Sequence, residues 1–226
     1  MSNGVLIVIE GTDGSGKATQ AGRLLEKLQA MGKDCRGLDF PRYGKPSATM
    51  VEQYLGGAFG NSPEAVNAYA ASLFYAVDRY ASYKEDWGDF YHKGGILVSN
   101  RYTTSNAVHQ GSKLEGQGRA DYLTWLSDLE YHRMAIPEPT LVVYLDMPTA
   151  VTEQLMAKRQ EATHTTADIH EQDGAYLRRC RDNAKAVAQT QGWQVISCAS
   201  DGVPRSMDDI SQEIWDLVAP LLACPL

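Results

Sequence analysis

The chain has 226 residues, of which 43% are hydrophobic and 22% are charged, and this ordinary globular composition suits a single domain over residues 1–226. The formal net charge is −7, which argues against a nucleic-acid-binding protein and against a membrane-surface protein, because both bind polyanions. No apolar run reaches the roughly 20 residues that span a bilayer. The cysteines form no C-x-x-C pair, so we expect a cytoplasmic protein with reduced thiols.

The first predicted strand, "VLIVIE" at 5–10, leads through a glycine-rich loop into a helical pattern that ends at Gly32. The loop matches the phosphate-binding motif G-x-x-x-x-G-K-[ST] up to Lys17. Its glycines let backbone N–H groups point inward at the start of the helix, and Lys17 adds a charge for the β- and γ-phosphates. The expected nucleotide-binding residues are Gly11, Asp13, Gly14, Ser15, Gly16, Lys17, Ala18 and Thr19.

Ala18 departs from this motif, because the last position usually carries a hydroxyl group that ligates Mg²⁺. Thr19 cannot simply replace that hydroxyl, since one helical step turns the side chain by about 100°. Asp13 is the nearest carboxylate in the loop that could hold a metal ion. We therefore expect the nucleotide to bind through the backbone and Lys17, with Asp13 as the metal ligand.

A weaker strand candidate at 35–40 precedes a long helical pattern at 63–87. One stripe with a period of 3.6 residues predicts a core-facing side, and its members are Val66, Tyr69, Ala70, Leu73, Val77 and Tyr80. Tyr75 lies away from the centre of that stripe, and Arg79 follows one turn later on the face of Tyr75. Such a pair suits a nucleobase, with the ring stacking and the guanidinium donating to a carbonyl, although a surface cation–π pair explains it equally well.

The strand predicted at 95–99 is followed directly by the polar residues Asn100, Arg101 and Tyr102. They lie at the edge of the sheet where ligands bind in α/β proteins. Arg101 can place two N–H groups on phosphate oxygens, and the alternative is a surface arginine at a strand end.

Two further strands are predicted at 141–146 and 193–197, and a helical pattern at 207–222 follows them. All the strands except the weak candidate consist of apolar runs, which indicate buried strands. Strands that alternate with helices predict an α/β fold with a parallel sheet and right-handed crossovers. The polar, Thr-rich segment 159–172 interrupts this pattern, either as a solvated loop or as a lid that closes over substrate.

Together these motifs resemble the thymidylate kinase family of nucleoside monophosphate kinases, over nearly the whole chain. The stretches that carry the resemblance are "IEGTDGSGK" (9–17), "DFPRYG" (39–44), "FYAVDR" (74–79), "NRYTTSNAVHQG" (100–111) and the lid "KRQ…DIHEQ" (158–172). The resemblance implies a P-loop nucleoside triphosphate hydrolase-like fold of three layers, in which helices flank a five-stranded parallel sheet. It also implies a short lid, a homodimer, and ATP with Mg²⁺ as the phosphate donor.

Carried over position by position, the resemblance assigns Arg101 to the 5′-phosphate of the acceptor dTMP. It assigns Phe40, Arg42 and Tyr43 to the loop beside that phosphate. Glu171, together with Asp168, corresponds to lid carboxylates near the sugar and the metal.

The resemblance likewise assigns the base-binding residues. Tyr75 corresponds to the aromatic side chain that stacks on the base, and Arg79 to the donor to thymine O4. Ser105 and Asn106 correspond to residues near the base, where an amide can face N3–H. His109 is a further substrate-binding candidate, at a position where tyrosine is common.

The chain also departs from the family pattern. Asn100 replaces the aspartate of the Asp-Arg-Tyr motif, and His170, like His109, stands where tyrosine is common. Members of the family neutralise the transferring phosphoryl group with an arginine in the glycine loop or in the lid. The glycine loop and the lid tip have none here, so Lys158 and Arg159 at the base of the lid are the remaining cations, and Arg159 is the candidate.

We therefore expect ATP-dependent phosphorylation of dTMP to dTDP by in-line transfer, which depends on positioning and charge stabilisation. The expected catalytic residues are Lys17, Asp13, Arg101, Arg159 and Glu171. One alternative is a kinase for another deoxynucleotide or for a deoxynucleoside, although a nucleoside has no acceptor phosphate for Arg101 to bind. A nucleotide-binding regulatory protein without catalysis is the other alternative, which Ala18, Asn100 and the arginine-poor lid favour.

Overall fold

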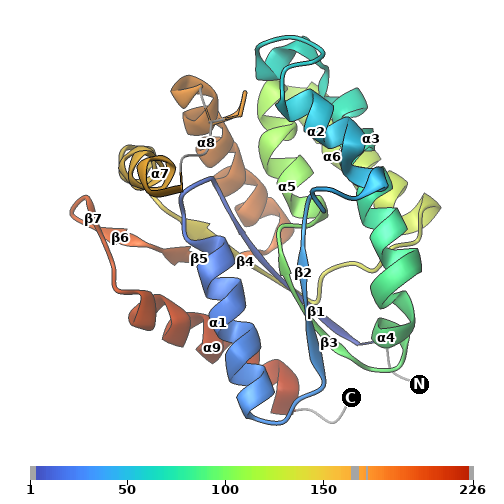
Figure 1. Cartoon of the computed structure of the whole chain (residues 1–226), viewed down its shortest axis with the longest axis vertical. Coiled ribbons are helices and arrows are strands. Elements are labelled where there is room, and N and C mark those ends of the chain that lie inside the picture. The colour runs from blue at the N-terminus through green and yellow to red at the C-terminus, as the bar shows by residue number, and fades with distance from the viewer. Residues whose placement is uncertain (1–3, 164–167, 172, 224–226) are drawn as a thin grey trace.

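The computed structural model describes residues 4–163, 168–171 and 173–223, with their side chains except those of 158–163 and 223. Five strands form one parallel sheet in the order β2-β3-β1-β4-β5. Their bounds are β1 Val5–Gly11, β2 Cys35–Asp39, β3 Ile96–Asn100, β4 Leu141–Asp146 and β5 Gln194–Ser197. Helices lie on both faces of this sheet, so the predicted three-layer α/β fold is confirmed (Figure 1).

Helices fill the segments between the strands, with short helical turns between some of them, and α1 and α9 take the places that the sequence pattern indicated. Their bounds are α1 Lys17–Ala30, α2 Thr49–Leu55, α3 Ala68–Ser82, α4 Gly88–His92, α5 Thr103–His109, α6 Gly116–Ser127, α7 Thr149–Thr163, α8 Gly174–Gln191 and α9 Met207–Ala223. A two-stranded hairpin, β6 (Ala199–Ser200) and β7 (Val203–Pro204), precedes α9. Because α7 continues to Thr163, the first part of the predicted lid 159–172 is helical, while residues 164–167 and 172 lie outside the described residues.

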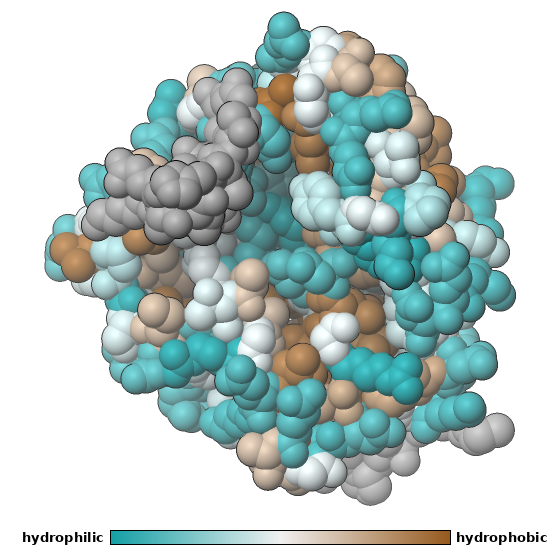
Figure 2. Space-filling view, viewed as in Figure 1, coloured by the Kyte–Doolittle hydropathy of each residue, from teal (hydrophilic) through white to brown (hydrophobic). Residues whose placement is uncertain are grey.

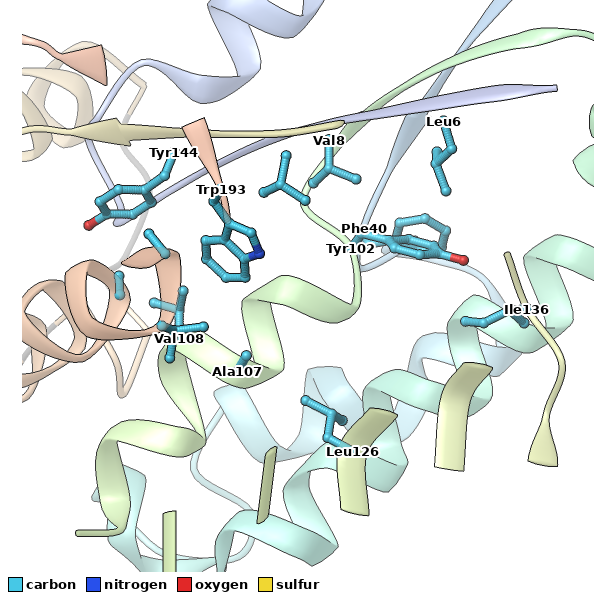
Figure 3. Close-up of a cluster of buried hydrophobic side chains, with 14 of the residues drawn as sticks. Leu6, Val8, Phe40, Tyr102, Ala107, Val108, Leu126, Ile136, Tyr144 and Trp193 are labelled. Atoms are coloured by element: carbon cyan, nitrogen blue, oxygen red, sulfur yellow. The ribbon is translucent and has the colours of Figure 1, made fainter. Parts of the chain in front are cut away.

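Successive side chains of β1 point to opposite faces of the sheet and so enter two different cores. Val5, Ile7 and Ile9 pack with side chains of α1 and α9. Leu6 and Val8 belong to the other core, and Figure 3 shows them pointing toward the helical layer that holds α5. Every residue of β1 is buried, which is typical of a central strand in a parallel sheet.

The strand predicted at 193–197 forms, but it is not buried as expected. β5 lies at the edge of the sheet, and Val195 is 49% exposed. An edge strand has a neighbour on one side only, so its apolar residues need not lie in the core.

The face of α3 that was predicted to enter the core is exposed instead. Tyr69, Leu73, Val77 and Tyr80 are between 38% and 54% exposed. The buried face of the helix carries mostly small residues, and among its members are Ala68, Ala71, Ser72, Ala76 and Arg79. Small side chains let the helix approach its neighbours closely. The period of 3.6 residues identifies the apolar face of α3, but it does not tell whether that face or the opposite one packs against the core.

The helix also begins later than position 63. Residues Pro63–Ala65 form a short 3₁₀ turn, and α3 starts only after Asn67. The Asn67 side chain accepts a hydrogen bond from the backbone N–H of Ala70 at 2.9 Å, which caps the first turn.

Because β3 is buried and β5 is exposed, the same substitution should destabilise the protein strongly in β3 and hardly at all in β5. Val98→Ala in β3 removes two methyl groups from the core and should lower the free energy of unfolding by about 2 kcal/mol. Val195→Ala in β5 should change it by less than about 0.5 kcal/mol. Urea unfolding followed by circular dichroism measures both, and equal losses would contradict the arrangement of the sheet.

Candidate active site

A cavity of about 790 Å³ lies at the carboxyl ends of β1, β2 and β3. In Figure 2, the surface is hollowed in the upper half of the molecule, and the residues inside the hollow have hydrophilic colours. Among its lining residues are Asp13, Gly14, Gly16, Lys17, Ala18, Thr19, Asp39, Phe40, Tyr43, Tyr75, Arg79, Asn100, Arg101, Ser105, Asn106, His109, Asp168, His170 and Glu171. Most of the predicted site residues therefore meet in one place, although they come from separate parts of the chain.

The glycine loop joins the end of β1 to the start of α1, as the motif predicts. Gly14 and Gly16 have φ angles of +79° and +88°, a backbone conformation that residues with a side chain rarely adopt. Gly11 and Ser15 do not line the cavity; a Cβ atom on Gly11 would lie only 2.4 Å from Ser15 Oγ. These two residues thus allow the close packing beneath the loop, whereas the others face the cavity.

Lys17 begins α1 and extends its ammonium group back over the loop. Its Nζ atom donates to the backbone carbonyl of Thr12 at 3.1 Å and lies 3.3 Å from Asp13 Oδ1. Burial, together with the neighbouring Arg101 cation, lowers the pKa of Lys17. An anion that enters the cavity would therefore meet a cation that is already held in position.

Arg101 follows β3 with a φ angle of +66°, an uncommon conformation for a residue with a side chain. Its guanidinium forms an ion pair with Asp13, donates to His109 Nε2 at 3.1 Å, and has Nη1 3.8 Å from Glu10 Oε1. Burial alone would lower the pKa of Arg101, but the carboxylates of Asp13 and Glu10 raise it. Arg101 is thus a permanent cation that lies beside the glycine loop.

Asp13 is paired with both of these cations. Burial alone would raise the pKa of Asp13, but Arg101 and Lys17 outweigh it and hold the pKa well below its usual range. Asp13 is therefore ionised at neutral pH. Asp13 thus forms ion pairs with Lys17 and Arg101, the two side chains that the sequence motifs assign to phosphate groups.

Arg42 was predicted to lie beside the acceptor phosphate, but the structure places its side chain outside the cavity. Its Nε donates to Asp78 Oδ1 at 3.1 Å and its Nη1 to Asp86 Oδ2 at 2.7 Å, and Arg42 does not line the cavity. Three carboxylates, of Asp78, Glu85 and Asp86, draw the guanidinium away. Arg42 consequently fixes the loop after β2, while Phe40 and Tyr43 of the same loop do line the cavity.

Tyr75 and Arg79 lie on the cavity side of α3, as expected for a base-binding pair. Arg79 is only 1% exposed, so the alternative of a surface cation–π pair is wrong. Its guanidinium is held by the buried carboxylate of Glu130, which no pattern in the sequence marked.

Two histidines close another side of the cavity. The rings of His109 and His170 stack with their centroids 5.7 Å apart, and His170 Nε2 lies 2.8 Å from the hydroxyl of Tyr54. Burial lowers the pKa of His170 to about 3, and burial together with Arg101 holds the pKa of His109 well below its usual value. Both rings are therefore neutral at neutral pH.

Near the end of the predicted lid 159–172, Asp168, His170 and Glu171 also line the cavity. Asp168 accepts hydrogen bonds from the backbone N–H groups of His170 at 2.8 Å and Glu171 at 2.9 Å. Burial raises the pKa of Asp168 to about 6. The side chain of Arg159 lies outside the described residues, so its predicted role stays a prediction.

Asp39 is a cavity carboxylate that the sequence did not single out. It ends β2 in register with Asn100 of β3, whose Nδ2 donates to Asp39 Oδ1 at 2.8 Å. Burial raises the pKa of Asp39. The signal that could have found it is its place at a strand end, since strand order brings that end beside Arg101.

No three histidine, cysteine, aspartate or glutamate side chains of the described residues converge as a ready-made metal site. Mg²⁺ nevertheless binds many sites through one or two carboxylates, substrate phosphates and water. Asp13, Asp39 and Glu171 line the cavity and offer such oxygens. The donor set therefore fits a Mg²⁺ ion that is held largely by a nucleotide.

The glycine loop, Arg101 and the Tyr75–Arg79 pair meet in this cavity, as the sequence motifs predict, and a family model for thymidylate kinase matches residues 9–210. The chain belongs to the thymidylate kinase family. It is 28% identical to the thymidylate kinase of Mycobacterium tuberculosis over 191 residues, 84% of this chain and 87% of that one. It is 30% identical to that of Thermomicrobium roseum, over 96% of this chain and 95% of that one.

A solved structure of the thymidylate kinase from Candida albicans has the same fold, with a TM-score of 0.70 at 18% identity. The match covers 97% of this chain and 93% of that one. Membership places the chain among the nucleoside monophosphate kinases, which are transferases. Within the described ranges, no helix combines the length and the apolar character needed to cross a membrane.

The low pKa of His170 predicts how stability changes with pH. Below about pH 6.5 the unfolded chain binds a proton at this residue and the folded chain does not, so stability falls as the pH falls from 6.5 toward 3. Between pH 7.5 and 5.5 one such group contributes a loss of about 1.4 kcal/mol. His170→Gln should remove that part of the loss, which urea unfolding at both pH values measures.

The control for this experiment is His132→Gln, at an exposed histidine outside the cavity. It should keep the pH dependence of the wild type. A His170→Gln protein with the same pH dependence as wild type would show that the ring is not held neutral by burial.

Proposed function

We propose that this chain transfers the γ-phosphoryl group of ATP to dTMP and so forms dTDP and ADP. The observation that carries this proposal is the meeting, in one cavity, of a phosphate-binding loop, an arginine at a strand end and an aromatic–arginine pair. These are the separate binding groups that a nucleotide donor and a nucleotide acceptor need. Membership in the thymidylate kinase family supports the choice of dTMP.

In this proposal, the backbone N–H groups of the glycine loop and Lys17 bind the phosphates of ATP. Arg101 binds the acceptor phosphate, near enough to the loop that it pairs with Asp13 in the structure. Tyr75 stacks on the base and Arg79 donates to its O4 atom, at the other end of the acceptor. The acceptor phosphate is already a nucleophile, so these residues contribute position and charge stabilisation, and no protein base is required.

A bound Mg²⁺ ion would neutralise phosphate charge and orient the two phosphates. We infer that Asp13 holds it, with Glu171 of the lid nearby, since both carboxylates line the cavity. Ala18 offers no hydroxyl for the ion. Arg159 is the proposed cation for the transferring phosphoryl group.

The proposal is tested by coupled ADP-release assays with dTMP, dUMP and thymidine as acceptors. The rate should be highest with dTMP and about 10–200-fold lower with dUMP, which lacks one methyl group. Thymidine should not react, because it has no phosphate for Arg101. Lys17→Ala should lower kcat by about 10²-fold or more, since Lys17 lies where charge develops during transfer.

Lys27→Ala is the matched control, because Lys27 is an exposed lysine on the same helix, away from the cavity. It should leave kcat unchanged. A wild-type protein without ADP release above background, or a Lys17→Ala protein with wild-type kcat, would reject the proposed function.

We also propose that two copies of the chain form a dimer through α3. The exposed side chains Tyr69, Leu73, Val77 and Tyr80 recur at helical spacing and form one apolar face. An exposed apolar face of this kind suits a two-fold contact between identical helices. The proposal explains why residues with a core-like pattern lie on the surface.

Val77→Glu places a charge in the proposed contact and should convert the dimer to a monomer. Val203→Glu is the control, since Val203 is also exposed but lies in the β6–β7 hairpin, and it should remain a dimer. Analytical ultracentrifugation gives both masses. A monomeric wild type, or a dimeric Val77→Glu protein, would reject the contact.

A further inference from the structure

A fully buried carboxylate lies behind the base-binding end of the cavity without lining it. Glu130 belongs to the π-helical segment Asp128–Arg133, which follows α6, and its side chain is 0% exposed. Its Oε2 accepts from Arg79 Nε and its Oε1 from Arg79 Nη2, both at 2.6 Å. Such a two-pronged pair fixes the plane of the guanidinium as well as its position.

The same carboxylate also orients Asn106. The nitrogen of this amide lies 3.4 Å from Glu130 Oε1 and 3.2 Å from the backbone carbonyl of Ser72. Both of these neighbours can only accept hydrogen bonds, so the end of the amide that faces them must be the NH₂ group. The Oδ1 atom makes no hydrogen bond within the described part of the chain, and Asn106 lines the cavity.

The cavity therefore presents a donor, from Arg79, and an acceptor, from Asn106. A 4-oxo pyrimidine such as thymine offers the complementary pair, an acceptor at O4 and a donor at N3. A 4-amino pyrimidine such as cytosine offers the reverse, a donor at the 4-amino group and an acceptor at N3. An arginine cannot accept a hydrogen bond, so cytosine would leave buried polar groups facing others of the same kind.

Stability alone gives little reason for the pair between Arg79 and Glu130. Replacing a buried ion pair by apolar side chains is often neutral for stability, because removing two charges from water is costly. Here the carboxylate holds two different cavity residues in the orientations that distinguish one base from another. A glutamine in its place would direct an NH₂ group at Arg79 in either orientation, and in one of them at Asn106 as well, so that the Asn106 amide could turn over.

We propose that Glu130 is the positioning residue that sets the order of donor and acceptor in the cavity, and so selects 4-oxo over 4-amino pyrimidine nucleotides. This inference rests on the proposed function and adds a residue that acts through Arg79 and Asn106. It assigns selectivity to a side chain that does not touch the substrate.

The test compares dTMP with dCMP as the ratio of their kcat/KM values, in wild type and in Glu130→Gln. The ratio should fall by about fivefold or more, since leaving a buried polar group unpaired costs at least about this factor. A merely structural lesion lowers the active fraction, which affects both nucleotides equally and leaves the ratio unchanged. The ratio of the two Kd values, measured by calorimetry, should fall in parallel.

Asp78→Asn is the matched control. Asp78 is a buried carboxylate that directly precedes Arg79 on α3, but it pairs with Arg42 outside the cavity. The same change from carboxylate to amide should leave the ratio within about twofold of wild type. Glu130→Asp is the second variant, because it keeps the charge and loses the length to reach both partners; it too should lower the ratio, and it decides the test if Glu130→Gln does not fold.

The inference is overturned if wild type prefers dTMP and the Glu130 variants keep that preference. It is also overturned if wild type does not distinguish dTMP from dCMP, or if Asp78→Asn lowers the ratio as much as Glu130→Gln. A wild type that binds both nucleotides but transfers no phosphate rejects the proposed function instead, and the Kd ratio then still decides the role of Glu130.

Discussion

The site depends on the buried carboxylate of Glu10 near the end of β1, which joins the start of the glycine loop to the first turn of α5. Its Oε1 accepts from the backbone N–H of Gly11 at 2.9 Å, and its Oε2 accepts from the hydroxyls of Thr104 and Ser105 at 2.7 Å each. A carboxylate taken out of water destabilises the fold unless polar groups replace the water. Here the replacing groups come from the glycine loop and from the first turn of α5, so satisfying one charge also positions the loop against that helix.

The charged side chains near Glu10 are likewise paired with one another. Lys17 and Arg101 are two cations in one cavity, and Arg101 contributes to lowering the pKa of Lys17. Asp13 lies between them and lowers their mutual repulsion. A phosphate group can take over this role from Asp13, because it offers several oxygens and more charge. The free protein thus keeps both cations in place without leaving either of them unpaired.

The sequence predicted the features that depend on local pattern. Four of the five strands of the parallel sheet came from short apolar runs, β2 was only a weak candidate, and the loop came from the spacing of its glycines and Lys17. The features that the sequence did not predict depend on where each segment lies in the fold. Periodicity groups the exposed residues of α3 correctly, but an apolar face can meet a second chain as well as the core. Arg42 turns away because of carboxylates 36 to 44 residues later, and Glu130 meets Arg79 across 51 residues. A buried ion pair between distant segments has no signature in either segment alone.

Asn100 shows how strand register changes the meaning of a departure from the family pattern. From the sequence alone, it removes a carboxylate from the phosphate-binding edge of the sheet. In the structure it lies in register with Asp39 and donates to that carboxylate at 2.8 Å. A second carboxylate at position 100 would face the first at this distance, and like charges so close would raise the pKa of one of them strongly. An amide avoids that repulsion, so the paired ends of β2 and β3 share one carboxylate, which Asp39 of β2 supplies.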